Sequence, residues 1–433
     1  MASKNRYFYK LLSWAALSLI ALSTYSCSEP ASPFGQTEIT VEALDASCTE
    51  VWLELKFRNL TQPADVAIQK DGKDYHRILS LNHDTLLVFE DLEPSTNYSF
   101  RAIIRYEGKD DKTSNTAPVR TMDTTSHSFT WQSWNFGTGA GTSRLNDIVV
   151  INKNNIWAVG FIKIDGVEYN AIHWDGIKWN YKQINYITNT GAHFSEIRSV
   201  FSFDDSSLFF GNMVTLQNSV YTSLDLNIEF PSLINKIWGG SLTDIYIAGD
   251  YGLLAHYNGK TWRKIETSAF AQTMRVRDIW SNPESGYVLA LATGFPYNFE
   301  NILIKIDKQS LQTEEIHHTT EQHTLISLWY KNDFNTFFGG SGIFKKNGLT
   351  KPIIEIPIIF PSLKRRLRGT EANNIYACDD FGNLTYFNGI RTRDISYASF
   401  IGITLGLDIN DNMIGIAGVE DNKSFVSLIK IQE

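Results

Sequence analysis

The most constraining feature of this sequence is an internal repeat with a period of a few tens of residues. Its clearest copy, residues 233–266, reads LINKIWGGSLTDIYIAGDYGLLAHYNGKTWRKIE and holds four short apolar segments. These segments are rich in β-branched and aromatic side chains, which is typical of strands. Asn258-Gly259 separates the third segment from the fourth, and Asn-Gly favours the positive φ angles of a tight hairpin. A four-stranded unit of this kind cannot bury both faces alone, so neighbouring copies must stack on one another.

Copies of this unit follow one another to the end of the chain, and we count seven. They begin near Leu145, Ile197, Leu233, Arg275, Leu325, Arg365 and Ile403. The sequence therefore predicts an all-β fold with a seven-bladed β-propeller. The turn recurs as Asp175-Gly176 and Asn388-Gly389, and we expect its glycines and the following tryptophans to be structural, namely Gly176, Gly259, Gly389, Trp179 and Trp262. His173 and His256 recur at equivalent positions of the repeat, and we expect them to be structural too.

The seventh copy contains only three strand segments. Residues 129–135, FTWQSWN, precede the first copy and resemble a fourth segment such as TWRKIE. Pairing of this segment with the last copy would close the ring and remove an open sheet edge. The alternative is that residues 129–135 are a linker. We expect closure and assign residues 128–433 to the propeller.

The turn HWDGIKW, residues 173–179, resembles the Asp-box turn of sialidase-like propellers. The resemblance covers only the turn and the tryptophan after it. In that family the turn is structural and lies away from the active site. The resemblance therefore implies propeller geometry and gives little support for glycosidase activity.

The N-terminus has the pattern of an export signal. Residues 1–26 combine a basic start, an apolar stretch and small residues, so we predict a signal peptide. Cys27 follows directly and resembles the acylated cysteine of bacterial lipoproteins, although Thr24 and Tyr25 depart from that pattern. The resemblance implies a lipid on Cys27, a spacer over residues 27–36, and a membrane-anchored protein at the outer membrane or cell surface. The alternative is ordinary cleavage, which would give a periplasmic or secreted soluble protein.

Residues 37–124 form a separate predicted domain with a hairpin at Asp71-Gly72. Within it LEPSTNY, residues 92–98, resembles the L-x-P-x-T-x-Y stretch of fibronectin type III domains. The resemblance implies a two-sheet sandwich in which the Tyr98 hydroxyl bonds the backbone a few residues upstream. It also implies that Trp52 takes the place of the tryptophan on that family's second strand. The role of Tyr98 is structural, so the resemblance implies a fold and no activity.

Composition argues against one class of function. The formal charge of −8 argues against nucleic-acid binding, which needs a basic surface. We expect Cys48 and Cys378 to be buried and unpaired. His317, His318 and His323 lie in a polar stretch that we expect to be a loop, and the segment from Asp408 to Asn412 reads as a polar turn. We predict no metal, no cofactor and a monomer.

One recurring position suggests a binding site. When the first segments of the copies are aligned, the second position holds Asn146, Arg198, Asn235, Arg277, Ile326 and Arg365, with Arg144, Arg275 and Arg366 close by. Innermost strands of a propeller line its channel, so these side chains would gather at one mouth. Converging guanidinium groups suit carboxylate or phosphate recognition. We predict ligand binding by Asn146, Arg198, Asn235, Arg277 and Arg365. The alternative is that they are solvated residues paired with Asp147, Asp278 and other acids.

These observations favour a non-catalytic surface protein whose propeller face binds a glycan, a peptide or a partner protein. No catalytic residue is predicted. The alternative is an extracellular carbohydrate-active enzyme, a glycoside hydrolase or lyase, since catalytic carboxylates in propellers come from separate blades and need no local motif. A pocket holding two carboxylates about 5–10 Å apart would favour that enzyme. A third possibility is a scaffold that helps to assemble larger complexes.

Overall fold

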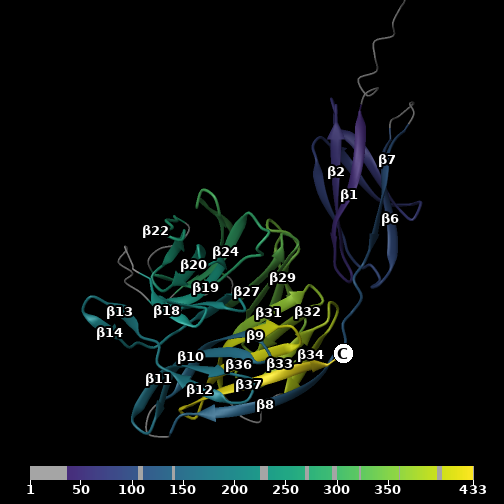
Figure 1. Ribbon diagram of the computed structural model, residues 1–433. Helices are drawn as coiled ribbons and strands as arrows, with labels where there is room; N and C mark the ends of the chain where they lie inside the picture. Colours follow the sequence, from purple (N-terminus) through teal and green to yellow (C-terminus); the bar gives the residue numbers. More distant parts are fainter. Residues whose placement is uncertain are drawn as a thin grey trace, which may run out of the picture.

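The computed structural model describes residues 37–105, 111–138, 142–224, 233–268, 273–294, 300–320, 323–359, 361–396 and 402–432. Over these residues the fold is all-β, with an N-terminal sandwich and a β-propeller beside it (Figure 1). None of the described residues forms a helix that could cross a membrane. The predicted signal peptide and Cys27 lie outside the described residues.

The sandwich consists of two antiparallel sheets. The three-stranded sheet has the order β1 (Glu38–Ala46), β2 (Val51–Arg58), β5 (Thr85–Phe89). The four-stranded sheet has the order β4 (Lys73–Leu81), β3 (Ala64–Lys70), β6 (Asn97–Arg105), β7 (Lys112–Arg120). Asp71 and Gly72 both have positive φ in the predicted β3–β4 hairpin. The predicted tyrosine bond is present, because the amide of Glu93 donates to Tyr98 Oη at 2.9 Å.

Trp52 does not fill the sandwich core, so that expectation is wrong. Side chains alternate along β2, and Val51, Leu53 and Leu55 point into the core. Trp52 therefore points outward, yet it is fully buried because the propeller covers it. Its ring stacks on Phe334 with centroids 5.4 Å apart. The residue belongs to the junction between the two units.

The propeller contains seven four-stranded antiparallel sheets among the described residues. The first three are β9 (Arg144–Asn152), β10 (Asn155–Ile164), β11 (Val167–Trp174), β12 (Trp179–Lys182); β15 (Val200–Asp204), β16 (Ser207–Phe210), β17 (Val214–Gln217), β18 (Val220–Ser223); and β19 (Ile234–Ser241), β20 (Asp244–Gly249), β21 (Leu254–Tyr257), β22 (Trp262–Lys264). A small hairpin, β13 (Tyr186–Thr188) and β14 (Gly191–His193), lies between the first and second sheets.

The remaining sheets continue the same order. They are β23 (Met274–Trp280), β24 (Tyr287–Gly294), β25 (Asn301–Asp307), β26 (Thr313–Thr319); β27 (Leu325–Asn332), β28 (Asn335–Gly340), β29 (Ile343–Lys346), β30 (Ile353–Ile356); β31 (Arg366–Glu371), β32 (Asn374–Cys378), β33 (Asn383–Phe387), β34 (Thr392–Ser396); and β35 (Ile403–Asn410), β36 (Met413–Glu420), β37 (Lys423–Gln432), β8 (Ser128–Phe136). The first strand of each sheet contacts the first strand of the next, and β35 contacts β9, so the sheets form a ring.

The predicted closure is confirmed. β8 pairs with β37 along its whole length, from Ser128 opposite Gln432 to Phe136 opposite Ser424. The N-terminal strand thus supplies the fourth strand of the last sheet. Phe136 is buried and packs in the same apolar cluster as residues of the first sheet and of β37. Closure therefore joins both ends of the propeller chain in one core.

The Asn-Gly and Asp-Gly turns are wider than predicted. Only the glycines have positive φ, with values of 91° at Gly176, 87° at Gly259 and 96° at Gly389. The residue before each glycine instead binds the turn with its side chain. In the third sheet Asn258 Oδ1 accepts hydrogen bonds from the amides of Lys260 and Thr261. A side-chain oxygen that caps its own turn replaces the second positive φ of a tight hairpin.

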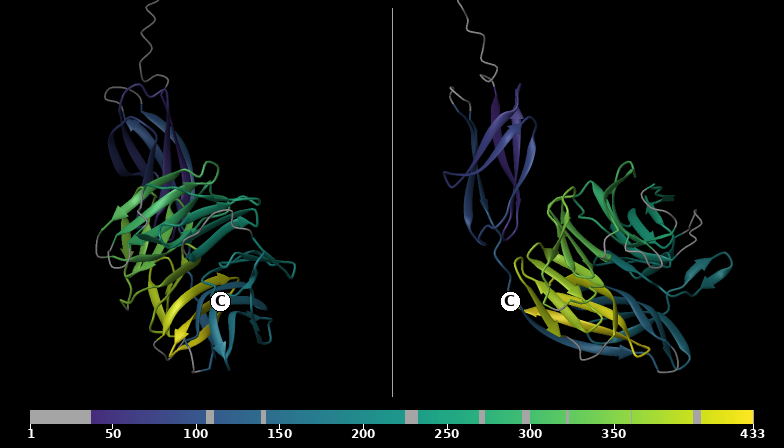
Figure 2. Two further views of the ribbon diagram at one scale, coloured as in Figure 1. Left: turned by 90° about the vertical axis from the view of Figure 1, so that its left-hand side faces the viewer. Right: turned by 180° about the vertical axis from the view of Figure 1, so that it is seen from behind.

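The sandwich packs on the propeller through the loop and strand of residues 45–52, which we call the junction (Figure 2). Glu50 Oε1 and Oε2 each lie 2.9 Å from Lys345 Nζ, and Trp52 Nε1 donates to the Asn347 carbonyl at 3.2 Å. Asp45 accepts bonds from the amide groups of Asn332 and Asn335. All these propeller residues belong to the fifth sheet, β27–β30. Asn332 and Asn335 lie at the connection from its first strand to its second, and Lys345 and Asn347 lie at or next to the connection from its third strand to its fourth.

That placement fixes which face of the propeller the sandwich covers. In an antiparallel sheet those two connections lie at the same end of the strands. The starts of the first strands lie at the other end. The sandwich therefore packs against the face opposite to the one where the first strands begin.

Candidate functional site

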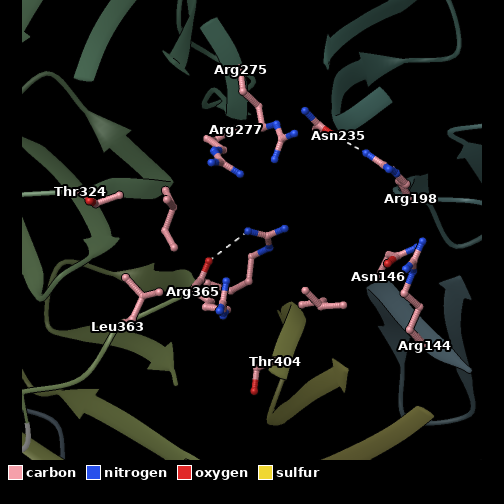
Figure 3. Close-up of a pocket in the computed structure, with 13 residues that line it drawn as sticks. Arg144, Asn146, Arg198, Asn235, Arg275, Arg277, Thr324, Leu363, Arg365 and Thr404 are labelled. Atoms are coloured by element: carbon pink, nitrogen blue, oxygen red, sulfur yellow. Dashed lines mark hydrogen bonds between the residues drawn. The ribbon is translucent and has the colours of Figure 1, made fainter. Parts of the chain in front are cut away.

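A cavity of about 440 Å³ lies where the innermost strands begin, and we call it the arginine cavity (Figure 3). All five residues predicted from the repeat line it: Asn146, Arg198, Asn235, Arg277 and Arg365. Arg144, Arg275, Arg366 and Ile326 line it as well. The repeat thus brings these residues to one mouth of the channel. Sequence reasoning missed Thr324, Leu363, Thr404 and Leu405, which precede or follow the aligned positions.

One group of cavity side chains is held by Glu196. Arg144 Nε donates to Glu196 Oε1 at 2.6 Å, and Asn146 Nδ2 donates to the same oxygen at 2.6 Å. Burial opposes ionisation of Glu196, but these bonds hold its pKa below the ordinary value. The charge of Arg144 is therefore neutralised within the protein.

Two further carboxylates hold cavity arginines. Asp250 Oδ1 lies 2.7 Å from Arg275 Nε and accepts a bond of 2.7 Å from Asn235 Nδ2. Arg198 approaches the same carboxylate at 3.7 Å. Arg365 Nε lies 2.6 Å from Asp380 Oδ1. The predicted alternative of acid-paired arginines therefore holds for Arg365, and Arg198 shares its acid with Arg275.

Arg277 and Arg366 differ from the other cavity arginines. Within the described ranges, neither has a carboxylate at salt-bridge distance. Arg277 Nε donates to the Thr293 hydroxyl at 2.9 Å, and Arg366 Nη1 donates to the carbonyl of Arg365 at 3.0 Å. Burial and the neighbouring charges of Arg275 and Arg366 lower the pKa of Arg277 to about 10. These two cations are therefore held beside other cations in a half-buried site.

The charges of the cavity do not balance among the described residues. Six arginines line it, whereas three carboxylates, Glu196, Asp250 and Asp380, bind them. Three positive charges remain in a protein whose formal charge is −8. Like charges that lie close together repel one another, and a bound anion would relieve that repulsion.

Asp147 and Asp278 are not the partners of these arginines, so the alternative is wrong for these two acids. Asp147 lies 2.7 Å from Lys236 Nζ, and Asp278 lies 3.1 Å from Arg368 Nη1. Neighbouring residues of a strand point in opposite directions, so Asp147 and Asp278 leave the cavity that Asn146 and Arg277 line. Each pair joins innermost strands that are not adjacent, β9 to β19 and β23 to β31.

These buried ion pairs divide the channel. Beyond them lies a second cavity of about 260 Å³, lined by Lys236, Trp280, Arg368 and Asp408 among others. Asp408 lies within β35 and not in a polar turn as expected. Its Oδ2 accepts a bond of 2.8 Å from the amide of Val150. Burial raises the pKa of Asp408 to about 6. Lys236 and Arg368 of the two ion pairs thus line the second cavity and not the arginine cavity.

The other singled-out residues have structural positions. His173 Nε2 lies 2.9 Å from Asn155 Oδ1, and His256 Nε2 lies 2.8 Å from Asp244 Oδ1. His317 and His318 lie on strand β26, so the expected loop is wrong for them. In the described part of the chain no group of three potential ligands could hold a metal ion.

Cys48 and Cys378 are buried and form no disulfide, as predicted. The turn tryptophans also pack as structural residues. Trp262 is buried in the cluster of β19–β22, and Trp179 packs in that of β9–β11. None of these side chains lines the arginine cavity.

Fold and cavity together define a β-propeller protein with a cationic channel mouth. No protein-family model matches the chain, and no curated protein matches it either. Solved structures of β-propellers do resemble it. A structure of YCF48 bound to D1 peptide is 12% identical with a TM-score of 0.51, covering 70% of this chain and 97% of that one. YCF48 from Cyanidioschyzon merolae is 12% identical with a TM-score of 0.50, covering 68% and 98%. The WD40 propeller domain of Doa1 is 14% identical with a TM-score of 0.49, covering 70% and 97%.

Proposed function

We propose that this protein is a non-catalytic binding protein whose arginine cavity holds an anionic group of a partner. The observation that carries the proposal is the pair Arg277 and Arg366, which lie in the cavity with no carboxylate at salt-bridge distance in the described residues. Burying such cations is costly unless a partner charge approaches. A carboxylate or phosphate would accept charge-assisted bonds from both guanidinium groups.

The solved propeller neighbours are consistent with a binding role. One of them, YCF48, is bound to a peptide of D1. At 12% identity this likeness concerns the fold, so it supports the proposal only by showing that such a scaffold takes a peptide ligand. The identity of the ligand of this chain rests on its own cavity.

The proposal extends to the whole chain. The sandwich is a fibronectin type III domain, as the LEPSTNY stretch and the Tyr98 bond suggest. The seven four-stranded sheets are the blades of a seven-bladed propeller. The protein is exported and anchored at a bacterial surface or outer membrane through a lipid on Cys27, and it acts as a monomer.

The chemistry of the cavity supports binding better than glycoside hydrolysis. A hydrolase needs a carboxylic acid whose pKa is raised, so that it donates a proton. Glu196 instead has a lowered pKa, because Arg144 and Asn146 bind it. Asp250 and Asp380 are likewise held by arginines. All three carboxylates fix cavity side chains, and the lowered pKa makes Glu196 a poor general acid.

Citrate, a trianion that matches the three excess charges, is a suitable probe. In the wild-type protein we expect saturable binding by calorimetry and a rise in melting temperature. The variant R277A/R366A should weaken binding at least about 100-fold, because each lost charged hydrogen bond costs about 1.5–3 kcal/mol.

The matched control is R263A/R393A, which removes two exposed arginines on β22 and β34 and changes the net charge equally. It should bind citrate as the wild type does. An equal loss of citrate affinity in both double variants would contradict the proposal, because it would show that citrate responds to the net charge of the protein and not to the arginine cavity. Absence of any citrate binding to the wild type would contradict it as well.

A further inference from the structure

We infer that the arginine cavity is the centre of a wider docking surface for a polypeptide, one that carries an acidic residue flanked by apolar ones. This inference rests on the proposed function and names the class of partner. It starts from the two loops that supply acids to the cavity. Asp250 is followed by Tyr251, and Asp380 is followed by Phe381. The same carboxylates bind Arg275 and Arg365.

Both aromatic side chains are exposed, Tyr251 by 61% and Phe381 by 48%. They occupy equivalent places in the repeat, since each lies between an aspartate and a glycine in the connection from the second strand to the third. An aromatic residue that served the core of the repeat would be buried there. Tyr251 also has a φ of 56°, which is unfavourable for a large side chain. The fold therefore holds these rings outward beside the cavity.

The backbone beside each ring is bonded to a segment that holds an exposed aliphatic residue. The amide of Asp250 donates to the carbonyl of Leu233 at 3.4 Å, and Leu233 is 52% exposed. The amide of Gly402 donates to the carbonyl of Asp380 at 3.2 Å, and the next residue, Ile403, is 44% exposed. Two exposed apolar pairs thus lie next to the acids that bind cavity arginines, one at the third sheet and one between the sixth and seventh sheets.

The cavity itself supplies apolar contacts between these pairs. Ile326, Leu363 and Leu405 line it together with the arginines. The whole surface, which we call the mouth surface, therefore combines exposed aromatic and aliphatic residues with arginines that carry excess charge. Arginine and aromatic residues are enriched at the centres of protein interfaces. Charge complementarity requires an acidic group at the centre of the partner, and the apolar pairs require apolar side chains on both sides of it.

The junction leaves this surface open. The sandwich binds the face where Asn347 and Asn332 lie, whereas Tyr251 and Phe381 lie in connections at the opposite end of the strands. A polypeptide in an extended form would cross the mouth from one apolar pair to the other. Its acidic side chain would then enter the cavity between them.

The test selects binders of the full-length protein from a random displayed peptide library. We expect enrichment of peptides in which Asp or Glu is flanked on both sides by Leu, Ile, Phe or Met. The selected peptides are then synthesised and titrated against the wild type and Y251N/F381S. This variant should bind them at least about tenfold more weakly and bind citrate unchanged. R277A/R366A should lose both ligands.

The matched control is Y75N/W131S, which removes two exposed aromatic residues of the sandwich and of β8. It should bind the peptides as the wild type does. Two outcomes would contradict the docking surface and leave the anion site intact. In one, the wild type binds citrate but no such peptides are enriched. In the other, Y251N/F381S binds the selected peptides as tightly as the wild type does. If sulfated or uronic polysaccharide binds in their place, the polypeptide class is wrong. If the wild-type protein does not bind citrate, the proposed function itself is wrong.

Discussion

At the residue scale, the same repeat position serves different purposes in different copies. Gly176, Gly259 and Gly389 all have positive φ, which favours glycine at each position. Gly389 has an additional role that no repeat pattern shows. A Cβ at this position would overlap Cys48 Sγ of the sandwich. The glycine of the sixth sheet therefore allows the sandwich to approach the propeller.

The variant G389A should be more destabilised than G166A. Gly166 has a φ of 85° but no heavy atom within 4 Å of an added Cβ, so G166A reports the cost of backbone strain alone, about 1–2 kcal/mol. Overpacking against Cys48 should add about 1–3 kcal/mol in G389A. Urea unfolding measures both values.

The double variant C48A/G389A should recover part of the additional cost, because it removes the atom that the methyl group meets. If G389A costs no more than G166A, the close approach of the two units is not real.

Sequence reasoning found the arginine cavity because its residues share one position in a repeat. The alternative of acid-paired arginines names Asp147 and Asp278 because these are near in sequence, and it is wrong for these two acids. The actual partners, Glu196, Asp250 and Asp380, come from connections between strands. The prediction for Trp52 fails because nothing in the sequence of a single strand shows that a second unit covers its outer face.

At the element scale, closure of the ring depends on two seams. β8 pairs with β37 at the outer edge of the last sheet. The sequence predicts this pairing, because the last copy lacks a fourth segment and residues 129–135 resemble one. At the centre, β35 meets β9 through the bond from the Val150 amide to Asp408. The sequence does not predict that contact, because two acids and two asparagines within five residues are typical of a solvated turn. Only the ring geometry brings Asp408 toward the buried Lys236 and Arg368.

Asp408 should make stability depend on pH. Burial raises its pKa from 3.8 to about 6. The folded state therefore binds more protons than the unfolded state between about pH 4 and 6, and stability falls as pH rises through this window. The variant D408N keeps an oxygen for the Val150 amide and has no charge. Above pH 6 it should be more stable than the wild type by about 1–3 kcal/mol, and this difference should shrink toward pH 4.

Urea unfolding of both proteins at several pH values measures the difference. D411N, which alters the exposed aspartate of the next turn, should show no such trend. If the free energies of unfolding of D408N and the wild type differed by the same amount from pH 4 to pH 7, ionisation of Asp408 would not destabilise the folded state, and the prediction would be wrong.

At the scale of the whole molecule, the junction makes the sandwich and propeller one body. Glu50 and Lys345 form a largely buried ion pair, and Asn347 donates to the same carboxylate at 3.1 Å. Burial opposes ionisation of Glu50, but Lys345 and the bonds from Ser47 and Asn347 hold its pKa below the ordinary value. Such a group stabilises the folded state above about pH 4.5 and loses this contribution as pH falls through its lowered pKa. The junction should therefore weaken in acid.

Loss of Trp52 should separate the two units without affecting the anion site. W52A removes a fully buried ring and the bond to the Asn347 carbonyl, which should cost about 3–5 kcal/mol at the junction. We expect one calorimetric unfolding transition in the wild type and two in W52A. The arginine cavity lies on the opposite face, so W52A should bind citrate with wild-type affinity. Y75A, an exposed aromatic residue on β4, should change neither property. A single transition in W52A would mean that the remaining contacts hold the units together, whereas a loss of citrate affinity would mean that the junction shapes the cavity.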